Sequence, residues 1–200
     1  VPRNATGALG NVQRTYVNNG TVHVQGIDVA LNWGIDVGPG SLNLGVNANY
    51  LMDFKSRSLP TLPLIDYVGT LGTTENGLNA TAYEYRVLTS IGYTLDAFNI
   101  GLQWEHKPSI EDTTEAVIGA STPTTGFPSY NIFHLNASYA LTEDVNVRFG
   151  VDNLLNKAPP VGNVNTAANP AIGQLAGGSF NAANYDTNGR RFYLGASLRF

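Results

Sequence analysis

Residues 27–52 read IDVALNWGIDVGPGSLNLGVNANYLM, and this stretch decides the fold. Every second residue is apolar from Ile27 to Val37 and again from Leu42 to Met52, while Asp, Asn, Ser and Gly fill most of the positions between them. Such alternation puts the apolar side chains of a β-strand on one face. Gly38-Pro39-Gly40 between the two runs is typical of a tight turn. The stretch predicts two antiparallel strands, each with an apolar and a polar face.

The same alternation returns in five further segments, so seven strands are predicted in all. The further segments are 85–95, 98–104, 133–141, 145–151 and 192–200. Most of the seven have about 9–11 residues, which is the length that a tilted strand needs to cross a bilayer. The first run changes phase near Gly26, because Val22 and Val24 would face with Asp28. This predicts a β-bulge at Gly26.

The predicted connections alternate in length. Short turns fall at 37–40, 96–97 and 142–144, and long loops at 53–84, 107–129 and 155–189. Outer-membrane barrels have short turns on the periplasmic side and long loops outside the cell. The last strand would therefore descend and end with Phe200 at the periplasmic side. The strand at 22–36 would also descend, with residues 1–21 in an extracellular loop or at the top of that strand.

The composition favours a membrane barrel over a soluble domain. Only 13% of the residues are charged, where about 25% is typical. A soluble β-sandwich would also alternate, but it explains neither this low charge nor the alternating connections. A net charge of -4 without a basic cluster argues against nucleic acid as a partner. There is no cysteine and no apolar run long enough for a transmembrane helix.

Three stretches resemble the TonB-dependent outer-membrane receptor family, and they occur in the family's order. They are Gly26-Ile27-Asp28-Val29, then FGVDNLLNK at 149–157 followed by Ala158-Pro159-Pro160, and Tyr185-Asp186 with Gly189-Arg190-Arg191-Phe192-Tyr193 leading to a terminal Phe. Leu155 departs from the commoner aromatic residue. The resemblance implies an all-β, transmembrane, antiparallel up-and-down β-barrel segment, with about seven C-terminal strands of a 22-stranded barrel.

The resemblance also implies a function. Residues 1–200 would be the C-terminal part of the barrel, with the plug and the N-terminal strands absent and supplied by an upstream segment. The receptor would lie in the outer membrane of a Gram-negative bacterium, with lipid around it, and import a scarce nutrient with energy that TonB delivers through the plug. An iron–siderophore complex, a glycan and a cobalamin-like molecule all stay open as substrates. A passive porin or a structural barrel component is the alternative, which a plug domain upstream of Val1 would exclude.

The C-terminal residues Tyr193, Gly195, Leu198 and Phe200 resemble the signal that outer-membrane proteins present to the barrel assembly machinery. An exposed strand edge is a template for strand addition, which gives such a signal a physical basis. An ordinary lipid-facing strand that ends in Phe would carry the same residues.

Candidate ligand-binding residues lie in the loops and on the polar face. Loop aromatics could line an external vestibule, or could pack the loops together: Tyr67, Tyr83, Phe127, Phe180 and Tyr185. Four arginines are predicted to face the lumen: Arg86, Arg148, Arg191 and Arg199. They could pair with lumen carboxylates such as Glu105 and Asp152 or with a plug, and Arg86 and Arg148 are the candidates for ligand contact.

The sequence offers no pattern for catalysis, metal or cofactor. His23, His106 and His134 lie on separate segments without metal-ligand spacing. The acidic loop residues Glu111, Asp112 and Glu115 fit a solvated loop better than a calcium site. Neither a Ser/His/Asp arrangement nor a nucleophile elbow is present. We therefore predict a protein that is not an enzyme, with no cofactor.

Overall fold

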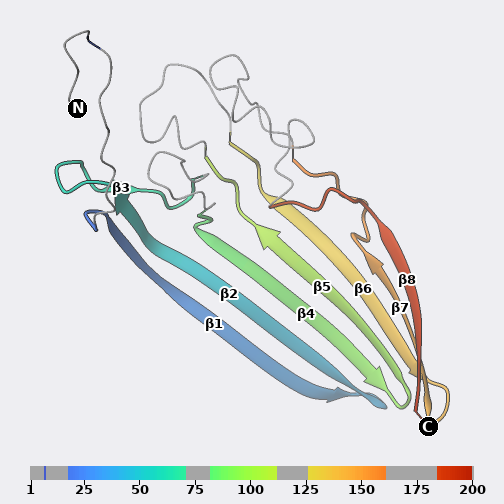
Figure 1. Cartoon of the computed structure of the whole chain (residues 1–200). Coiled ribbons are helices and arrows are strands. Elements are labelled where there is room, and N and C mark those ends of the chain that lie inside the picture. The colour runs from blue at the N-terminus through green and yellow to red at the C-terminus, as the bar shows by residue number, and fades with distance from the viewer. Residues whose placement is uncertain (1–6, 8–17, 71–81, 112–125, 161–183, 200) are drawn as a thin grey trace.

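The fold is an antiparallel β-sheet, shown in Figure 1. The structure is a computed structural model, and it describes residues 7, 18–70, 82–111, 126–160 and 184–199. Its strands are β1 (Thr21–Val37), β2 (Gly40–Arg57), β3 (Ile65–Asp66), β4 (Tyr85–Leu95), β5 (Phe98–Lys107), β6 (Tyr130–Ala140), β7 (Val145–Asp152) and β8 (Arg191–Leu198). Seven lie side by side in the order β1-β2-β4-β5-β6-β7-β8, and β3 pairs with β2. The seven predicted strands are confirmed.

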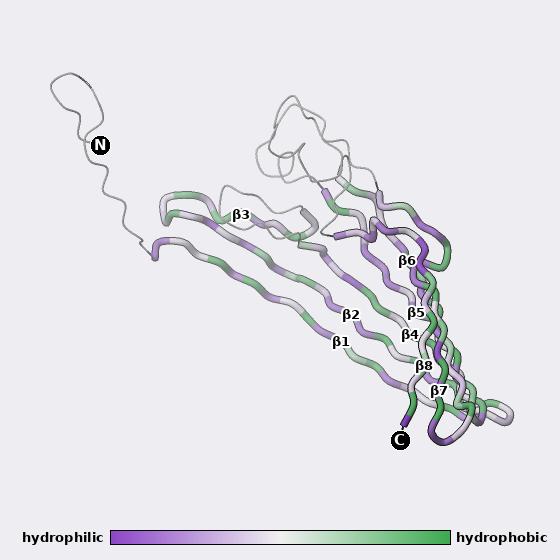
Figure 2. Tube along the Cα trace, turned by 45° about the vertical axis from the view of Figure 1, so that its right-hand side comes forward, coloured by the Kyte–Doolittle hydropathy of each residue, from purple (hydrophilic) through white to green (hydrophobic). Residues whose placement is uncertain are grey.

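The register of the sheet collects the apolar side chains on one face. A row of paired residues crosses all seven strands and is apolar throughout: Trp33, Leu44, Ile91, Leu102, Leu135, Val151 and Phe192. The next row along the strands is polar or glycine: Asn32, Gly45, Ser90, Gln103 and His134. Figure 2 shows this alternation of hydrophobic and hydrophilic residues along the strands. Since successive residues point to opposite faces, the sheet has one apolar face and one polar face.

Most of the apolar face is uncovered within the part of the chain that the structure describes, and Val151, at 4% exposed, is the exception in the row above. Leu31 and Trp33 are 52% and 51% exposed, and Leu194 is 77% exposed. A continuous apolar face of this extent is unfavourable in water but favourable against lipid. Strands β4, β5 and β6 have 11, 10 and 11 residues, which suits a tilted crossing of the bilayer. None of the described residues forms a helix of the length and hydropathy that a membrane span requires.

The three short turns lie together at one end of the sheet, and the described ends of the longer connections lie at the other (Figure 1). In the β1–β2 turn Gly38 has a φ of 60°, which glycine adopts at little cost. In the β4–β5 turn Asp96 has a φ of 48°, a conformation that Asp tolerates better than most residues. In the third turn the Leu141 amide donates to the Val145 carbonyl at 2.9 Å. This arrangement confirms the predicted alternation of short and long connections.

The predicted bulge is present, but its extra residue lies on the neighbouring strand. The register passes from the pair Gln25–Asp53 to the pair Gly26–Leu51, so Met52 of β2 is the additional residue. A Cβ at Gly26 would lie 2.7 Å from the Tyr50 carbonyl oxygen, so the close approach of the two backbones requires a glycine.

The predicted loop 53–84 is too long, because β2 continues to Arg57 and β3 pairs with Lys55 and Ser56. The bulge shifts the phase of alternation after Met52, which ends the apolar pattern before the strand ends. At the other end of the chain β8 stops at Leu198, and Phe200 lies outside the described residues.

Candidate functional site at the loop end of the sheet

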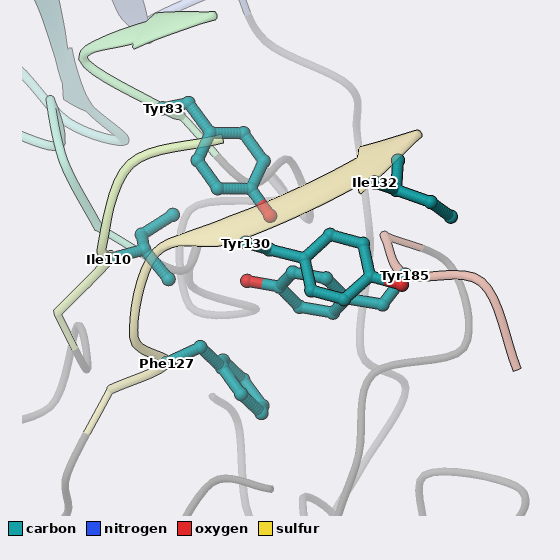
Figure 3. Close-up of a cluster of buried hydrophobic side chains, with 6 residues drawn as sticks. All are labelled: Tyr83, Ile110, Phe127, Tyr130, Ile132 and Tyr185. Atoms are coloured by element: carbon teal, nitrogen blue, oxygen red, sulfur yellow. The ribbon is translucent and has the colours of Figure 1, made fainter. Parts of the chain in front are cut away.

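A buried aromatic cluster lies at the loop end of β4, β5 and β6. It consists of Tyr83, Ile110, Phe127, Tyr130, Ile132 and Tyr185 (Figure 3). The Tyr185 ring lies 5.2 Å from the Tyr130 ring, edge to face at 74°, and 5.5 Å from the Phe127 ring. Such pairs add to the stability gained from burying the rings. Tyr185 therefore joins the segment before β8 to the segments around β5 and β6.

Backbone hydrogen bonds bring these segments together. Ile110 follows β5 and Phe127 precedes β6, and each donates its amide to the other's carbonyl at 2.8 Å. The Glu111 amide donates to Gly69, and the Gly69 amide donates to Ala82, at 2.8 and 2.7 Å. Segments after β3, before β4, after β5 and before β6 thus meet in one place.

Two hydroxyl groups inside this cluster form no hydrogen bond of regular geometry with the described residues, although they interact with each other. They belong to Tyr83 and Tyr185, which are 7% and 4% exposed. Figure 3 shows both hydroxyls turned toward the middle of the cluster. Burial raises the pKa of the Tyr83 phenol, and the neighbouring Tyr185 raises it further; burial likewise raises the pKa of Tyr185. A buried hydroxyl without a well-formed hydrogen bond costs about 1–3 kcal/mol, so an oxygen acceptor within reach of either phenol would be stabilised.

The segment that carries Tyr185 is held by a cation from β5. The Lys107 ammonium donates to the Asn184 carbonyl at 2.6 Å and lies 5.7 Å from the centre of the Tyr185 ring. It also pairs with Glu105 at 3.0 Å. One lysine therefore contributes a hydrogen bond, an ion pair and a cation–π contact.

Asn153, which directly follows β7, holds the same segment. It is 1% exposed and has a φ of 51°. Its Oδ1 accepts from the Lys157 amide at 2.7 Å, and its Nδ2 donates to the Lys157 carbonyl at 2.9 Å and to Asp186 Oδ2 at 3.4 Å. Because the side chain both donates and accepts, it ties the turn after β7 to the residue that follows Tyr185.

Asn156 and Asp186 complete this arrangement, and with Asn153 we call them the loop anchor. Asn156 has a φ of 52°, and its Oδ1 accepts from the Arg190 amide at 3.0 Å. Asp186 Oδ1 accepts from the Asn188 amide at 3.0 Å. The loop anchor joins the end of β7 to the start of β8, which gives the Asn-Leu-Leu-Asn stretch a structural role. Sequence reasoning singled out that stretch but not this role.

The polar face carries a row of ion pairs beside the loop anchor. Arg191 contacts Asp152 at 3.4 Å and Asp186 at 3.2 Å, and His134 Nδ1 lies 3.3 Å from Asp152. The predicted pairing of an arginine with Asp152 is therefore confirmed. The other predicted carboxylate, Glu105, pairs with Lys107 instead.

The remaining predicted arginines have other contacts. Arg86 donates to Asn49 Oδ1 at 3.3 Å, and the Arg148 side chain lies over Gly195. Arg199 lies past the end of β8, where its amide donates to the Asp144 carbonyl at 2.9 Å. The register places Arg86 and Arg148 on the polar face, opposite Asn49 and Ser138.

The polar face is hollowed in two places, of about 490 and 760 Å³. The first is lined mainly by uncharged groups, among them Asn32, Asn43, Ser90, Gln103 and Asn136. The second also includes the charged residues Asp28, Arg86 and Glu105. Amide side chains both donate and accept hydrogen bonds, so this face suits a polar partner without requiring a charged one.

The candidate ligand residues fall in different places. Tyr83, Phe127 and Tyr185 come together in the aromatic cluster, whereas Tyr67 is 1% exposed and lies against Phe54, with the ring centres 6.3 Å apart. Phe180 lies outside the described residues. Contact of any of them with a ligand stays a prediction.

Three members of the cluster were missed by sequence reasoning, namely Ile110, Tyr130 and Ile132. The strand β6 begins at Tyr130, before its predicted start at Phe133. Tyr130 and Ile132 point to the face opposite to that of Phe133, so the apolar pattern that begins at Phe133 does not include them.

The histidines are separated in space. His106 stacks on Tyr85 and its Nδ1 lies 2.9 Å from Asn131 Oδ1, while His134 pairs with Asp152 and His23 lies opposite Lys55. Across the ranges that the structure describes, no group of three or more His, Asp or Glu side chains could hold a metal ion. Of the acidic loop, Asp112 and Glu115 lie outside those ranges.

An antiparallel sheet of membrane-crossing length, with a lipid-compatible face, a polar face and short turns at one end, is the wall of a transmembrane β-barrel. The sheet is not closed within the described residues. The family model described as "TonB dependent receptor-like, beta-barrel" matches residues 1–154, and the chain belongs to this family. No curated protein and no solved structure matches the chain. The family is one of transporters rather than enzymes, and its barrels are typically in the outer membrane of Gram-negative bacteria.

Proposed function

We propose that this chain is part of the wall of an outer-membrane receptor that takes up a scarce nutrient with energy from TonB. The observation that carries the proposal is the family match over residues 1–154, on a sheet whose two faces suit lipid and a polar lumen. The same proposal places the chain in the outer membrane of a Gram-negative bacterium, with TonB acting through a plug that the receptor supplies.

The remaining strands of the barrel belong to this proposal. Among the described residues β1 and β8 each pair with a strand on one side only. Unpaired backbone groups are costly in lipid, and spanning sheets close into barrels for this reason. A further segment of the receptor would therefore supply the strands that pair with β1 and β8, and would carry the plug.

The loop end of the sheet is the place where we propose that the nutrient first binds. Support comes from the convergence of several loop segments on Tyr83, Phe127 and Tyr185, and from the two buried phenol hydroxyls among them, which form no hydrogen bond of regular geometry with the described residues. Arg86 and Arg148 would contact the nutrient deeper on the polar face, and Tyr67 and Phe180 from the loops. A siderophore complex, a glycan and a cobalamin-like molecule are all compatible with these groups.

Uptake by cells tests the proposal. Cells without the receptor gene and cells without TonB are compared with the parent strain for uptake of labelled ferric siderophores, oligosaccharides and cobalamin. We expect both deletions to abolish uptake of the same nutrient, and a protonophore to do so in the parent strain. Uptake that needs the receptor but neither TonB nor the proton gradient would show a passive porin instead.

We also propose that the assembly machinery reads Tyr193, Gly195, Leu198 and Phe200. Support comes from β8, which offers an unpaired strand edge among the described residues. Deletion of Phe200 should reduce the amount of receptor inserted in outer membranes, measured as the fraction that resists protease. Insertion at the parent level would contradict this reading.

A further inference from the structure

Hydrophobic alternation leaves one ambiguity in the alignment of a strand. A slip of one residue turns every apolar side chain to the wrong face, so it is strongly disfavoured. A slip of two residues keeps every side chain on its proper face. Alternation alone therefore permits several alignments of β8 on β7, and another feature must select one of them.

A row of paired residues on the polar face has an unusual composition. Across the seven strands it reads Gly34, Asn43, Gly92, Gly101, Asn136, Gly150 and Tyr193. Each of its three larger side chains lies beside at least one glycine. A Cβ at Gly34 would lie 3.1 Å from Asn43 Oδ1, and a Cβ at Gly101 would lie 2.8 Å from Asn136 Oδ1. In this row glycine makes room for the side chain of the next strand.

The fit is closest between β7 and β8, where it is reciprocal. Gly150 of β7 pairs with Tyr193 of β8, and a Cβ at Gly150 would overlap the Tyr193 ring. In the adjacent pair on the same face, Arg148 of β7 lies opposite Gly195 of β8, where a Cβ would lie 2.8 Å from Arg148 Nε. Each strand thus offers one large side chain and one glycine to its neighbour.

Slips of two residues destroy this fit. In one direction Gly150 would lie opposite Gly195 and Tyr193 opposite Asp152, which leaves two glycines facing each other. In the other direction Tyr193 would lie opposite Arg148, so that two long side chains would compete for one position. Either slip also separates Arg191 from Asp152, its partner in the observed register.

We propose that Tyr193 and Gly195 of β8, with Gly150 and Arg148 of β7, form a register lock that selects one alignment of β8 from those that alternation permits. The lock acts through shape on the polar face, while the apolar face only excludes slips of one residue. It does not depend on the transport role of the receptor, nor on whether the assembly machinery also reads Tyr193 and Gly195.

Disulfide trapping reads the register directly, because the 200 residues contain no cysteine. Val147 and Ala196 lie opposite each other on the apolar face, and cysteines there would report the observed register, since a disulfide spans directly opposed residues. Cysteines at Val147 with Leu194 or with Leu198 would report the two slips. The pairs are introduced into the complete receptor, freed of other cysteines, and oxidised in outer membranes.

When the four residues of the register lock are unchanged, we expect only the Val147–Ala196 disulfide to form. Tyr193→Ala and Gly150→Ala should each lower its yield and produce the Val147–Leu194 or Val147–Leu198 disulfide, which the parent lacks. The exchange of the two residues, Gly150→Tyr with Tyr193→Gly, should restore the Val147–Ala196 disulfide alone, because one strand again offers the ring and the other the glycine.

Phe192→Ala is the matched control. It also removes an aromatic ring from β8, but on the apolar face, where the ring lies opposite Val151 and not opposite a glycine. It should leave the observed register unchanged. If the Tyr193→Ala receptor does not accumulate in the membrane, the milder variants Arg148→Ala and Gly195→Ala are measured instead. We expect them to give smaller yields of the slipped disulfides. A Val147–Ala196 yield equal to the parent's in all the lock variants, with no slipped disulfide, would overturn the proposal.

Discussion

The membrane-crossing wall and the loop end of this sheet are built on different principles. In the wall, the role of a residue follows from its position in the alternation, and one row from Trp33 to Phe192 is apolar across seven strands. At the loop end, the role of a residue follows from individual atoms, as with the two polar atoms of Asn153 that bind Lys157 and Asp186.

The difference concerns how each region responds to change. The wall should accept many residues of the right polarity, because lipid and water decide between its faces. The loop end should respond to the exchange of a single atom, because its polar groups are buried and have specific partners.

A charge on the apolar face should have the largest effect. Leu102→Arg places a cation near the middle of β5 on the lipid side, which costs about 2–4 kcal/mol in a membrane barrel. Gln103→Arg, one residue along and on the polar face, should change stability by at most about 0.5 kcal/mol. Urea titration of the receptor in lipid vesicles measures both variants. Equal effects would show that the two faces are wrongly assigned.

A single-atom change in the loop anchor should come next. Asn153→Asp removes the amide that donates to Asp186 and to the Lys157 carbonyl, and it sets two carboxylates side by side, at a cost of about 1–3 kcal/mol. We expect roughly tenfold faster hydrogen exchange at the Lys157 and Arg190 amides. Adding Asp186→Asn should slow exchange again in part, because the amide introduced at position 186 can donate to the carboxylate introduced at position 153, while the bond to the Lys157 carbonyl stays lost.

Asn188→Asp serves as the control for the loop anchor, since it adds the same charge at an exposed position nearby. It should leave exchange at Lys157 as in the parent. Exchange in the double variant as fast as in Asn153→Asp alone would show that the hydrogen bond between positions 153 and 186 does not hold the loop anchor.

Alkaline pH should loosen the aromatic cluster and leave the wall intact. Burial raises the pKa of Tyr83 and Tyr185, whereas an unfolded tyrosine ionises near about pH 10. Because the folded pKa is the higher one, this contribution to stability is complete below about pH 10 and is lost as pH rises toward the folded pKa. Phenolate absorbance should show these two tyrosines ionising only above about pH 10. Ionisation of both at the pH of an unfolded tyrosine would contradict their burial.

The smallest effect should come from removing one buried hydroxyl that lacks a well-formed hydrogen bond. Tyr185→Phe keeps the ring and deletes such a hydroxyl, so the free energy of unfolding should stay the same or rise by up to about 1 kcal/mol. Tyr130→Phe is the contrast, since it deletes a hydroxyl that donates to the Lys157 carbonyl at 3.4 Å, and it should be neutral to slightly destabilising. Urea titration measures both. A loss of stability in Tyr185→Phe would indicate that its hydroxyl has a partner.

Sequence reasoning predicted the wall well because period-2 alternation is a local signal. It placed seven strands, their faces and the short turns, and it located the register shift near Gly26. It missed the extension of β2 to Arg57 because Met52, the extra residue of the bulge, reverses the phase of the pattern. It assigned that residue to the wrong strand because one sequence does not show which of two paired strands is longer.

The loop end could not be predicted to the same degree. Its contacts join residues far apart in the chain, such as Tyr83 with Tyr185 and Lys107 with Asn184, and alternation carries no information about such pairs. The sequence did single out Asn153-Leu154-Leu155-Asn156 as a family-like stretch. The left-handed backbone at Asn153 and Asn156, which Asn tolerates better than most residues, is the physical reason for two Asn residues there.

The order of the strands restricts the number and the direction of the further strands that can complete the barrel wall. Seven strands that alternate in direction leave β1 and β8 running the same way, so these two could pair with each other only in parallel. A barrel wall in which all neighbours are antiparallel needs an odd number of further strands between them, whose first and last members run opposite to β1 and β8. A second copy of this seven-stranded sheet cannot meet that requirement in the same membrane orientation, because both of its edges have the same direction as well. Any partner that closes this wall must therefore bring edges of the opposite sense.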